Sequence, residues 1–271
     1  MHSKDTFQCG LSARERIVAN AFARKELATV TTADVMDLLD VHRAAASQLL
    51  QRMAKKGWLL RVRRGLYAPV PLGTPAGAAV EDPWKLAMAL YSPGYISGWS
   101  AAEHWDLTDQ IFNSISVVAT VPQRARAQTH GGVDFLVATA KPDRLFGTKK
   151  IWRGSSQVVV ADPSRLIIDV LDSVALGGGA RHTLDITRNY WQSRHASPDL
   201  LLNYAERFGV GAVFKRLGFT AQLFGDVGEP WLARCRAGMS SGVSRLDPTG
   251  PHRGRTVSHW RLRINVPLES G

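Results

Sequence analysis

Residues 57–67, Gly-Trp-Leu-Leu-Arg-Val-Arg-Arg-Gly-Leu-Tyr, decide the fold of the first part of the chain. They predict a β-hairpin with its tip at Arg63-Arg64-Gly65, a tight turn that carries two positive charges. Gly57 is typical of the residue that ends a helix, so we expect a helix immediately before the hairpin.

Two short helices are expected upstream of the hairpin. Residues 31–34, Thr-Thr-Ala-Asp, fit the [ST]-x-x-[DE] pattern of a helix start. Val35, Leu38 and Leu39 follow at spacings of three and one and form an apolar helical face. A turn at residues 40–43 then leads into a second helix that runs to about Lys56.

The second helix has a core row spaced by three and four, formed by Ala46, Leu49, Leu50 and Met53. An earlier helix, from about residue 12 to residue 25, has a predicted buried stripe of Ile17, Val18, Ala21 and Phe22. Helix, helix, turn, helix and basic hairpin together predict a winged helix-turn-helix. In that architecture the second helix of the pair enters the major groove and the wing meets phosphate or the minor groove.

The polar face of this domain supplies the candidate site residues. Four side chains can present donors and acceptors to base edges: Ser47, Gln48, Gln51 and Arg52. Five cations are better suited to phosphate: Arg43, Lys55, Arg61, Arg63 and Arg64. The alternatives are a solvated helix face beside a structural hairpin, and a winged helix that binds only protein.

The charge distribution favours nucleic acid. The chain has 271 residues and a formal net charge of +11, with 34 Lys and Arg against 23 Asp and Glu. Residues 41–70 hold seven Lys or Arg and no acid. The segment 69–77, with three prolines and two glycines, resembles a linker. We therefore predict a DNA-binding domain over residues 1–73 and a second domain over residues 74–271.

The second domain is predicted to be a larger mixed α/β domain. Asp82-Pro83 and Asp162-Pro163 are helix starts, and Gly177-Gly178-Gly179 is expected to end the second of these helices. Strands are expected at residues 114–121, 133–139, 157–161 and 258–265, and a long loop at residues 238–255. Most tryptophans, including Trp152, are expected in the core or in an interface.

Catalytic and metal-binding signals are weak. Residues 238–242 match G-x-S-x-G but lack the strand before and the helix after that a nucleophile elbow needs. Asp169 and Asp172 are expected to be surface groups or partners of Arg165. No metal-ligand spacing, nucleotide-binding motif, secretory signal or membrane-length apolar stretch is present in the sequence. We expect a cytoplasmic protein that is not an enzyme, with no catalytic residues, no metal and no cofactor.

The chain resembles the AbiE-type (AbiEi-like) antitoxin family of type IV toxin–antitoxin systems. The hairpin at 57–67 looks like the wing of that family. Three later segments also match, in the same order: residues 95–102, residues 162–169 with Gly177-Gly178 beyond them, and residues 201–209 with 215–218. The ordered set spans roughly residues 30 to 225 and is more specific than any of its segments alone.

The resemblance implies an autorepressor that binds inverted repeats of duplex operator DNA, and a C-terminal domain that counteracts a nucleotidyltransferase-like toxin. It also implies a role in phage defence. The family's DNA-contacting cations map onto Arg43, Arg52, Lys55, Arg61, Arg63 and Arg64.

Two other functions remain open. One is a winged-helix transcriptional regulator whose C-terminal domain senses a ligand or dimerises. The other is an enzyme with a DNA-binding appendage. Against a nucleotidyltransferase, Gly154-Ser155 is not followed by the paired acids that would hold its metal.

Overall fold

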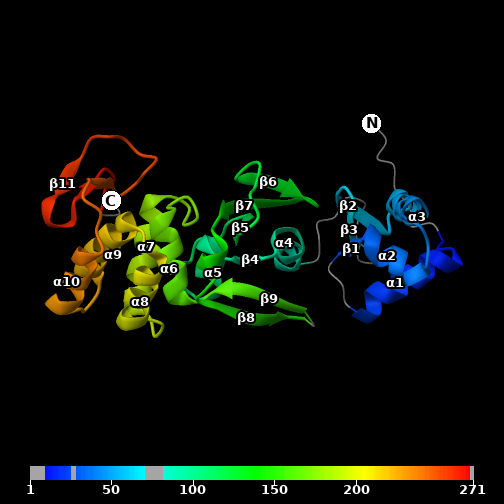
Figure 1. Cartoon of the computed structure of the whole chain (residues 1–271), viewed down its shortest axis with the longest axis horizontal. Coiled ribbons are helices and arrows are strands. Elements are labelled where there is room, and N and C mark those ends of the chain that lie inside the picture. The colour runs from blue at the N-terminus through cyan, green and yellow to red at the C-terminus, as the bar shows by residue number, and fades with distance from the viewer. Residues whose placement is uncertain (1–9, 26–28, 71–81, 155, 269–271) are drawn as a thin grey trace.

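The structure is a computed structural model that describes residues 10–25, 29–70, 82–154 and 156–268. The helices of the N-terminal part are α1 (Ala13–Lys25), α2 (Thr32–Leu39) and α3 (Arg43–Lys55). Its strands are β1 (Val30–Thr31), β2 (Leu59–Arg63) and β3 (Leu66–Pro69), which form an antiparallel sheet in the order β1-β3-β2. This is the predicted winged helix-turn-helix, and it occupies one end of the molecule (Figure 1).

Local signals place the boundaries of α2 and α3. Thr31 and Asp34 form the expected capping box, in which the Thr31 hydroxyl accepts from the Asp34 amide at 3.1 Å and the Asp34 carboxylate accepts from the Thr31 amide at 2.7 Å. Asp40 ends α2 in the left-handed conformation, with φ 48°. Gly57 follows α3 with φ 81°, a value that favours glycine.

The N-terminal core is small. The predicted core row of α3 is buried, together with Val18 and Phe22 of α1. The prediction is wrong for Ile17, whose side chain is 47% exposed. Only the face of α1 that carries Val18 and Phe22 is buried. A short helix that packs on two other helices buries only a narrow stripe of its surface.

The C-terminal part contains seven helices in the described residues: α4 (Pro83–Tyr91), α5 (Gly98–His104), α6 (Pro163–Asp172), α7 (Ala180–Gln192), α8 (Pro198–Phe208), α9 (Gly211–Phe224) and α10 (Glu229–Ala237). A six-stranded mixed sheet has the order β6-β7-β5-β4-β9-β8, from β4 (Gly94–Ile96), β5 (Ser114–Ala119), β6 (Ala127–His130), β7 (Val133–Thr139), β8 (Thr148–Arg153) and β9 (Ser156–Ala161). A small sheet of order β10-β12-β11 comprises β10 (Ser244–Arg245), β11 (Arg255–Val257) and β12 (Leu262–Ile264).

These elements confirm the predicted mixed α/β domain. The six-stranded sheet lies in the middle of the molecule, helices α6 to α10 follow it, and the small sheet covers the end farthest from the winged helix (Figure 1). The predicted strands at 114–121, 133–139 and 157–161 are present as β5, β7 and β9. The strands β6 and β8 were not predicted, because both are edge strands in which most side chains are polar and exposed or half-buried.

Three further expectations differ from the structure. The helix α6 ends at Asp172, and Gly179, with φ 109°, is instead the residue that precedes α7. Trp152, expected in the core or in an interface, is 67% exposed on the edge strand β8 and so is not a core residue. The predicted strand 258–265 is divided into a 3₁₀ turn, Ser258–Trp260, and β12, because Arg261 adopts a left-handed conformation with φ 47°.

The wing hairpin is buried on both faces. Leu59 and Tyr67 belong to the small N-terminal core. Val62, Leu66 and Ala68 belong instead to the same cluster of buried side chains as α4 and the large sheet. The predicted linker at 69–77 lies largely outside the described residues. Among the described residues, the two parts are connected through the packing of the wing.

A buried ion pair lies at the centre of the C-terminal part. The Arg165 side chain is fully buried and its Nη2 lies 2.9 Å from Oδ1 of Asp169, one helical turn along α6, as the sequence suggested. Asp169 also accepts from Ser97 Oγ at 2.8 Å and from Tyr95 Oη at 3.0 Å. Burial raises the pKa of Asp169, and the guanidinium of Arg165 opposes that rise.

We predict that Asp169→Asn lowers the free energy of unfolding by about 3–5 kcal/mol, because it leaves the Arg165 charge buried without a counter-ion. The matched control is Asp185→Asn, which removes the partner of Arg188 in a half-exposed pair and should cost less than about 1 kcal/mol. Urea unfolding followed by circular dichroism measures both, and equal costs would contradict the assigned role of the buried pair.

Candidate nucleic-acid interface

The recognition helix α3 presents a polar face because its other face fills the core. Ala46, Leu49, Leu50 and Met53 are buried, so the residues between them lie outward. Of the candidate residues on α3, five are exposed: Arg43, Gln48, Gln51, Arg52 and Lys55. Ser47 is half-buried, and its Oγ accepts a hydrogen bond from Nε2 of Gln51 at 3.3 Å. Ser47 therefore orients the Gln51 amide as well as lying beside it.

The wing adds three exposed arginines. Arg61 stands opposite Tyr67, and a register shift in β2 places Arg63 opposite Leu66. Arg63 lies close enough to the C-terminal part for its charge to act on Tyr91. Burial raises the pKa of Tyr91 to about 12, and the positive charge of Arg63 opposes that rise. Arg64 lies at the turn beside Gly65, which has φ 75°.

The candidate cations have no acidic partners among the residues that the structure describes. Within the described ranges, Arg43, Arg52, Lys55, Arg61, Arg63 and Arg64 take part in none of the ion pairs. The seventh cation of the acid-free run behaves differently. Lys56 Nζ lies 2.7 Å from Oε2 of Glu15, which is 1% exposed, and so ties the end of α3 to the start of α1. The six remaining cations are free to neutralise phosphates.

Glu15 shows why sequence reasoning missed this tie. Ser12 and Glu15 cap α1, since the Ser12 amide donates to Glu15 Oε2 at 2.7 Å. Burial raises the pKa of Glu15, but the hydrogen bonds from Lys56 and Ser12 outweigh it and lower the pKa overall. The partner of Lys56 lies 41 residues away, so no local pattern could identify it.

The other candidate sites have a structural explanation. Residues 238–242 follow the helix α10 and lead toward the strand β10, and so do not connect a strand to a following helix. In the part of the chain that the structure describes, no group of three or more His, Cys, Asp or Glu side chains is placed to hold a metal ion. The described helices also include none that is long and apolar enough to cross a bilayer.

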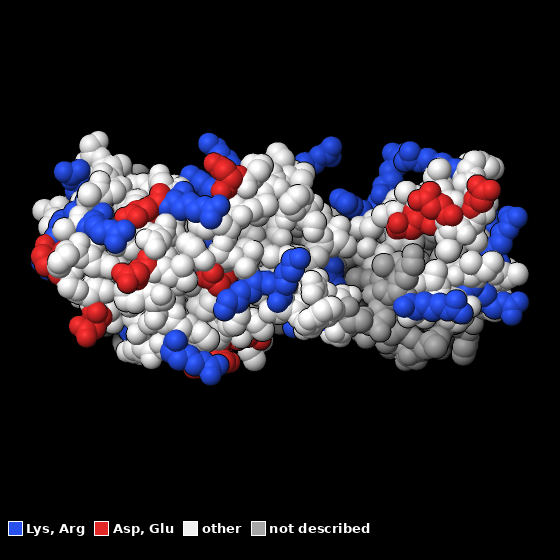
Figure 2. All heavy atoms as spheres, turned by 60° about the horizontal axis from the view of Figure 1, so that its bottom comes forward, with Lys and Arg blue, Asp and Glu red and all other residues white. Residues whose placement is uncertain are grey.

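Basic side chains also occur outside the winged helix. On the face shown in Figure 2 they are distributed along the whole length of the molecule, with acidic side chains between them in both parts. The charge density alone therefore does not define the interface. The cations of α3 and the wing are exposed, adjacent in the fold and without an ion pair among the described residues, and they lie on a winged helix.

The fold resembles that of a solved structure. The Rv2827c protein from Mycobacterium tuberculosis matches with a TM-score of 0.61 at 17% sequence identity, over 93% of this chain and 92% of that chain. At this identity the likeness concerns the fold alone. No curated protein sequence matches the chain.

The N-terminal part also matches a sequence family. Residues 19–70 fit the model of a family described as transcriptional regulator, AbiEi antitoxin. The matched residues run from the middle of α1 to the end of the wing and contain every candidate DNA-contacting residue. Over these residues the winged-helix part of this chain is therefore similar to the AbiEi antitoxin family of transcriptional regulators.

Proposed function

We propose that the protein is the antitoxin of a type IV toxin–antitoxin system and represses its own operon. The set of free cations on α3 and the wing carries the DNA-binding half of this proposal, because six such side chains on one small domain form an electrostatic footprint for duplex DNA. The family match of the same residues supports the regulatory role. The antitoxin half rests on the family match and on the resemblance of later segments.

The roles divide by chemistry. Arg43, Lys55, Arg61, Arg63 and Arg64 contact phosphates and position the domain. Gln48, Gln51 and Arg52 lie on the exposed face of α3 and read base edges, with Arg suited to guanine and Gln to adenine. The C-terminal part counteracts a nucleotidyltransferase-like toxin, and the operator consists of inverted repeats.

We predict that Arg61→Gln with Arg64→Gln weakens binding to every duplex by a similar factor. Each lost phosphate contact reduces the slope of log K against log salt by about 0.9, so the double variant should lose about 1.8. Fluorescence anisotropy with operator and scrambled duplexes measures the affinity and its salt slope. The salt concentration is varied from about 50 to about 300 mM. Arg124→Gln with Arg126→Gln, two exposed arginines of the C-terminal part, is the control with the same change in net charge.

Gln48→Ala and Arg52→Ala should act differently from the wing variants. Loss of a bidentate base contact costs about 1–3 kcal/mol on the operator, while binding to scrambled DNA changes less. The ratio of the two affinities, measured at one salt concentration, is the readout. If operator and scrambled affinities fall together, these residues do not read sequence and belong with the phosphate contacts.

Co-expression of the full-length protein is predicted to relieve the growth arrest caused by the neighbouring toxin. A variant with Arg52→Gln, Arg61→Gln and Arg64→Gln should still relieve it while losing repression of an operon reporter, because these side chains lie outside the C-terminal part. Both proteins are expressed from the same heterologous promoter so that autorepression does not alter their levels. Persistent growth arrest with the full-length protein would remove the antitoxin assignment.

A further inference from the structure

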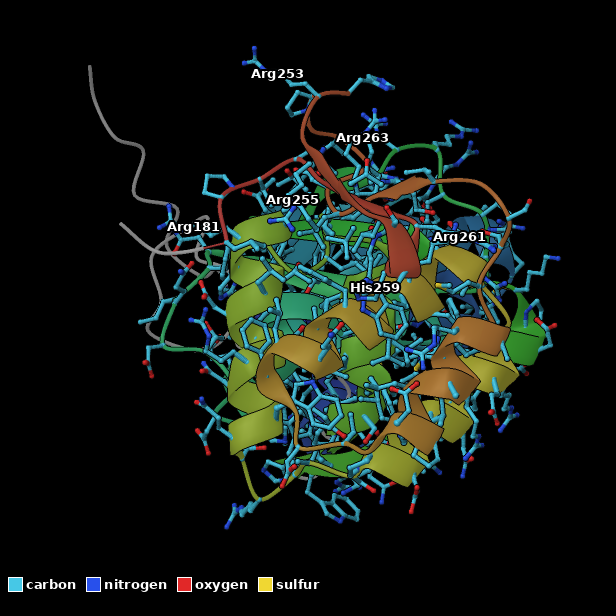
Figure 3. The ribbon with its side chains drawn as sticks, turned by 90° about the vertical axis from the view of Figure 1, so that its left-hand side faces the viewer. Arg181, Arg253, Arg255, His259, Arg261 and Arg263 are labelled. Carbon is cyan, nitrogen blue, oxygen red and sulfur yellow. The ribbon has the colours of Figure 1, made fainter. Side chains whose placement is uncertain are left out.

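A second group of basic side chains lies at the end of the molecule opposite the winged helix (Figures 1 and 3). We call it the distal basic face, and it consists of Arg181, Arg253, Arg255, His259, Arg261 and Arg263. Arg181 extends from α7, and the others come from β11, β12 and the segments that connect the strands of the small sheet. All of them are exposed except Arg263, which is half-buried. Residues 248–268 contain four arginines and two histidines but no acid, so this is a second acid-free basic run.

The small sheet is held firmly on α9. Trp260 is fully buried and lies over Gly218, where an added Cβ would stand 2.1 Å from Cζ3 of the indole. The indole Nε1 donates to Oε1 of Gln222 at 2.6 Å, and the His259 ring lies 3.0 Å from the same oxygen. The 3₁₀ turn at the centre of the face is therefore fixed to a helix of the main domain.

Two buried cations of α9 anchor the other side of the sheet. Nε and Nη2 of Arg216 donate to the carbonyl of Arg245 at 3.1 and 3.0 Å. Lys215 Nζ donates to Ser244 Oγ at 3.2 Å. Burial lowers the pKa of Lys215, and the nearby charges of Arg261 and Arg216 lower it further. The support beneath the face is thus itself positive, and it presents the surface arginines on a rigid base.

The charges of the face are not neutralised within the described residues. None of its arginines takes part in an ion pair there. The acid that precedes the run, Asp247, has Oδ1 occupied by the amide and the hydroxyl of Thr249, at 2.8 and 2.7 Å. Asp185, one turn along α7 from Arg181, pairs with Arg188 at 3.3 Å. Uncompensated like charges gathered on one surface repel one another, and a polyanion relieves that repulsion.

The uncharged side chains of the face favour a phosphate backbone over a protein. Between residues 238 and 268 the large hydrophobic side chains that are exposed are Val243 and Leu268, whereas protein interfaces bury aromatic and aliphatic anchors at their centre. Thr249, Thr256 and Ser258 are exposed and offer hydroxyl groups. Arginine with Ser and Thr hydroxyls is the composition of phosphate contacts.

The same side chains favour a duplex over a single strand. Single-stranded nucleic acid binds through aromatic platforms on which bases stack. The tryptophan of this segment is buried, and the aromatic rings that are exposed between residues 238 and 268 of the described chain are the imidazoles of His252 and His259. The cations are also spread across an end face from α7 to β12 (Figure 3), which suits the outer surface of a duplex.

We propose that the distal basic face is a second, sequence-independent site for duplex DNA, so that one molecule connects two duplex segments. Binding at the face does not depend on the winged helix. The connection of two segments does rest on the proposed function, because the first segment is the one held by α3 and the wing. Once the winged helix is bound to one duplex segment, the distal basic face is held near other segments of the same DNA. The effective concentration of DNA at the face is then raised.

The test uses the full-length protein and three triple variants. The distal variant carries Arg181→Gln, Arg253→Gln and Arg255→Gln, which are exposed and make no ion pair in the described structure. Arg261 is left unchanged because its Nη1 donates a hydrogen bond to the carbonyl of Ser240 at 3.3 Å. The matched control carries Arg124→Gln, Arg126→Gln and Arg194→Gln, also exposed. The winged-helix variant carries Arg52→Gln, Arg61→Gln and Arg64→Gln.

The first measurement is capture of a fluorescent 30-base-pair duplex by beads that carry a second duplex, with each variant as the connecting protein. Wild type and matched control should capture the free duplex, and the distal variant should lose most of the capture, by about tenfold or more for three lost phosphate contacts. Capture by the distal variant at the wild-type level would overturn the proposal and show that winged helices of two copies connect the duplexes. An equal loss in the matched control would also overturn it, as an effect of net charge.

The second measurement separates the two sites. Adding the distal changes to the winged-helix variant should lower its remaining affinity for random duplex and reduce the salt slope by about 2.7, three contacts at about 0.9 each. An unchanged slope would contradict the distal site whatever the winged helix does. If the winged-helix changes alone have no effect on binding, the proposed function fails while the distal site stands on its own slope. Displacement of the DNA by tenfold less double-stranded RNA would replace the proposed partner with RNA.

Discussion

The wing hairpin contributes buried side chains to the hydrophobic cores of both parts of the molecule. Its Leu59 and Tyr67 side chains complete the small core, and its Val62, Leu66 and Ala68 side chains enter the large one. Burying each Val or Leu of this kind contributes about 1.5–3 kcal/mol. A hairpin that exposed either face would leave apolar surface without cover. The winged helix is therefore seated against the C-terminal part through the element that also carries Arg61, Arg63 and Arg64.

This double packing restricts where the wing can meet DNA. Both faces of the hairpin carry buried side chains, so a partner can reach it only through its exposed arginines, Arg61, Arg63 and Arg64. Arg64 lies in the turn of the hairpin, whereas the charge of Arg63 also acts on Tyr91 of the C-terminal part. The orientation of the wing relative to α3 is consequently set by two cores at once. The wing and α4 have side chains in the same buried cluster. A change in the C-terminal part that moved α4 would therefore be transmitted to the wing through this cluster.

Local sequence signals were sufficient for the elements whose ends are capped by near neighbours. The Thr31–Asp34 box, the Asp82 and Asp162 caps and the core row of α3 all depend on residues within four positions of each other, and all are present. The order of helices and the basic hairpin then predicted the winged helix. The candidate residues on α3 could be found in the same way, since exposure follows from the helical period, and those of the wing could be found from the basic turn of the hairpin.

The features that sequence reasoning missed depend on distant residues. The strands β6 and β8 lie at the edges of the sheet, where exposed polar side chains hide the hydrophobic pattern. The triple glycine has the composition of a helix end, but the turn at residues 174–178 packs between α6 and α7 and gives Gly179 to the next helix. Gly218 carried no local signal, because its role depends on Trp260, far along the chain.

The two acid-free runs show what charge patterning can decide. Each run excludes a local counter-ion, since no acid lies within it. Neither run excludes a distant one, and Lys56 is the case in which a distant acid, Glu15, is found. Only the fold establishes that the other cations of residues 41–70, and the arginines of residues 248–268, are not paired within the described chain. A charge that the fold supports on a rigid base but leaves uncompensated raises the electrostatic energy of the isolated protein. Binding an anion recovers that energy. A cation without an acidic partner is therefore better evidence of a binding surface than the net charge of its domain.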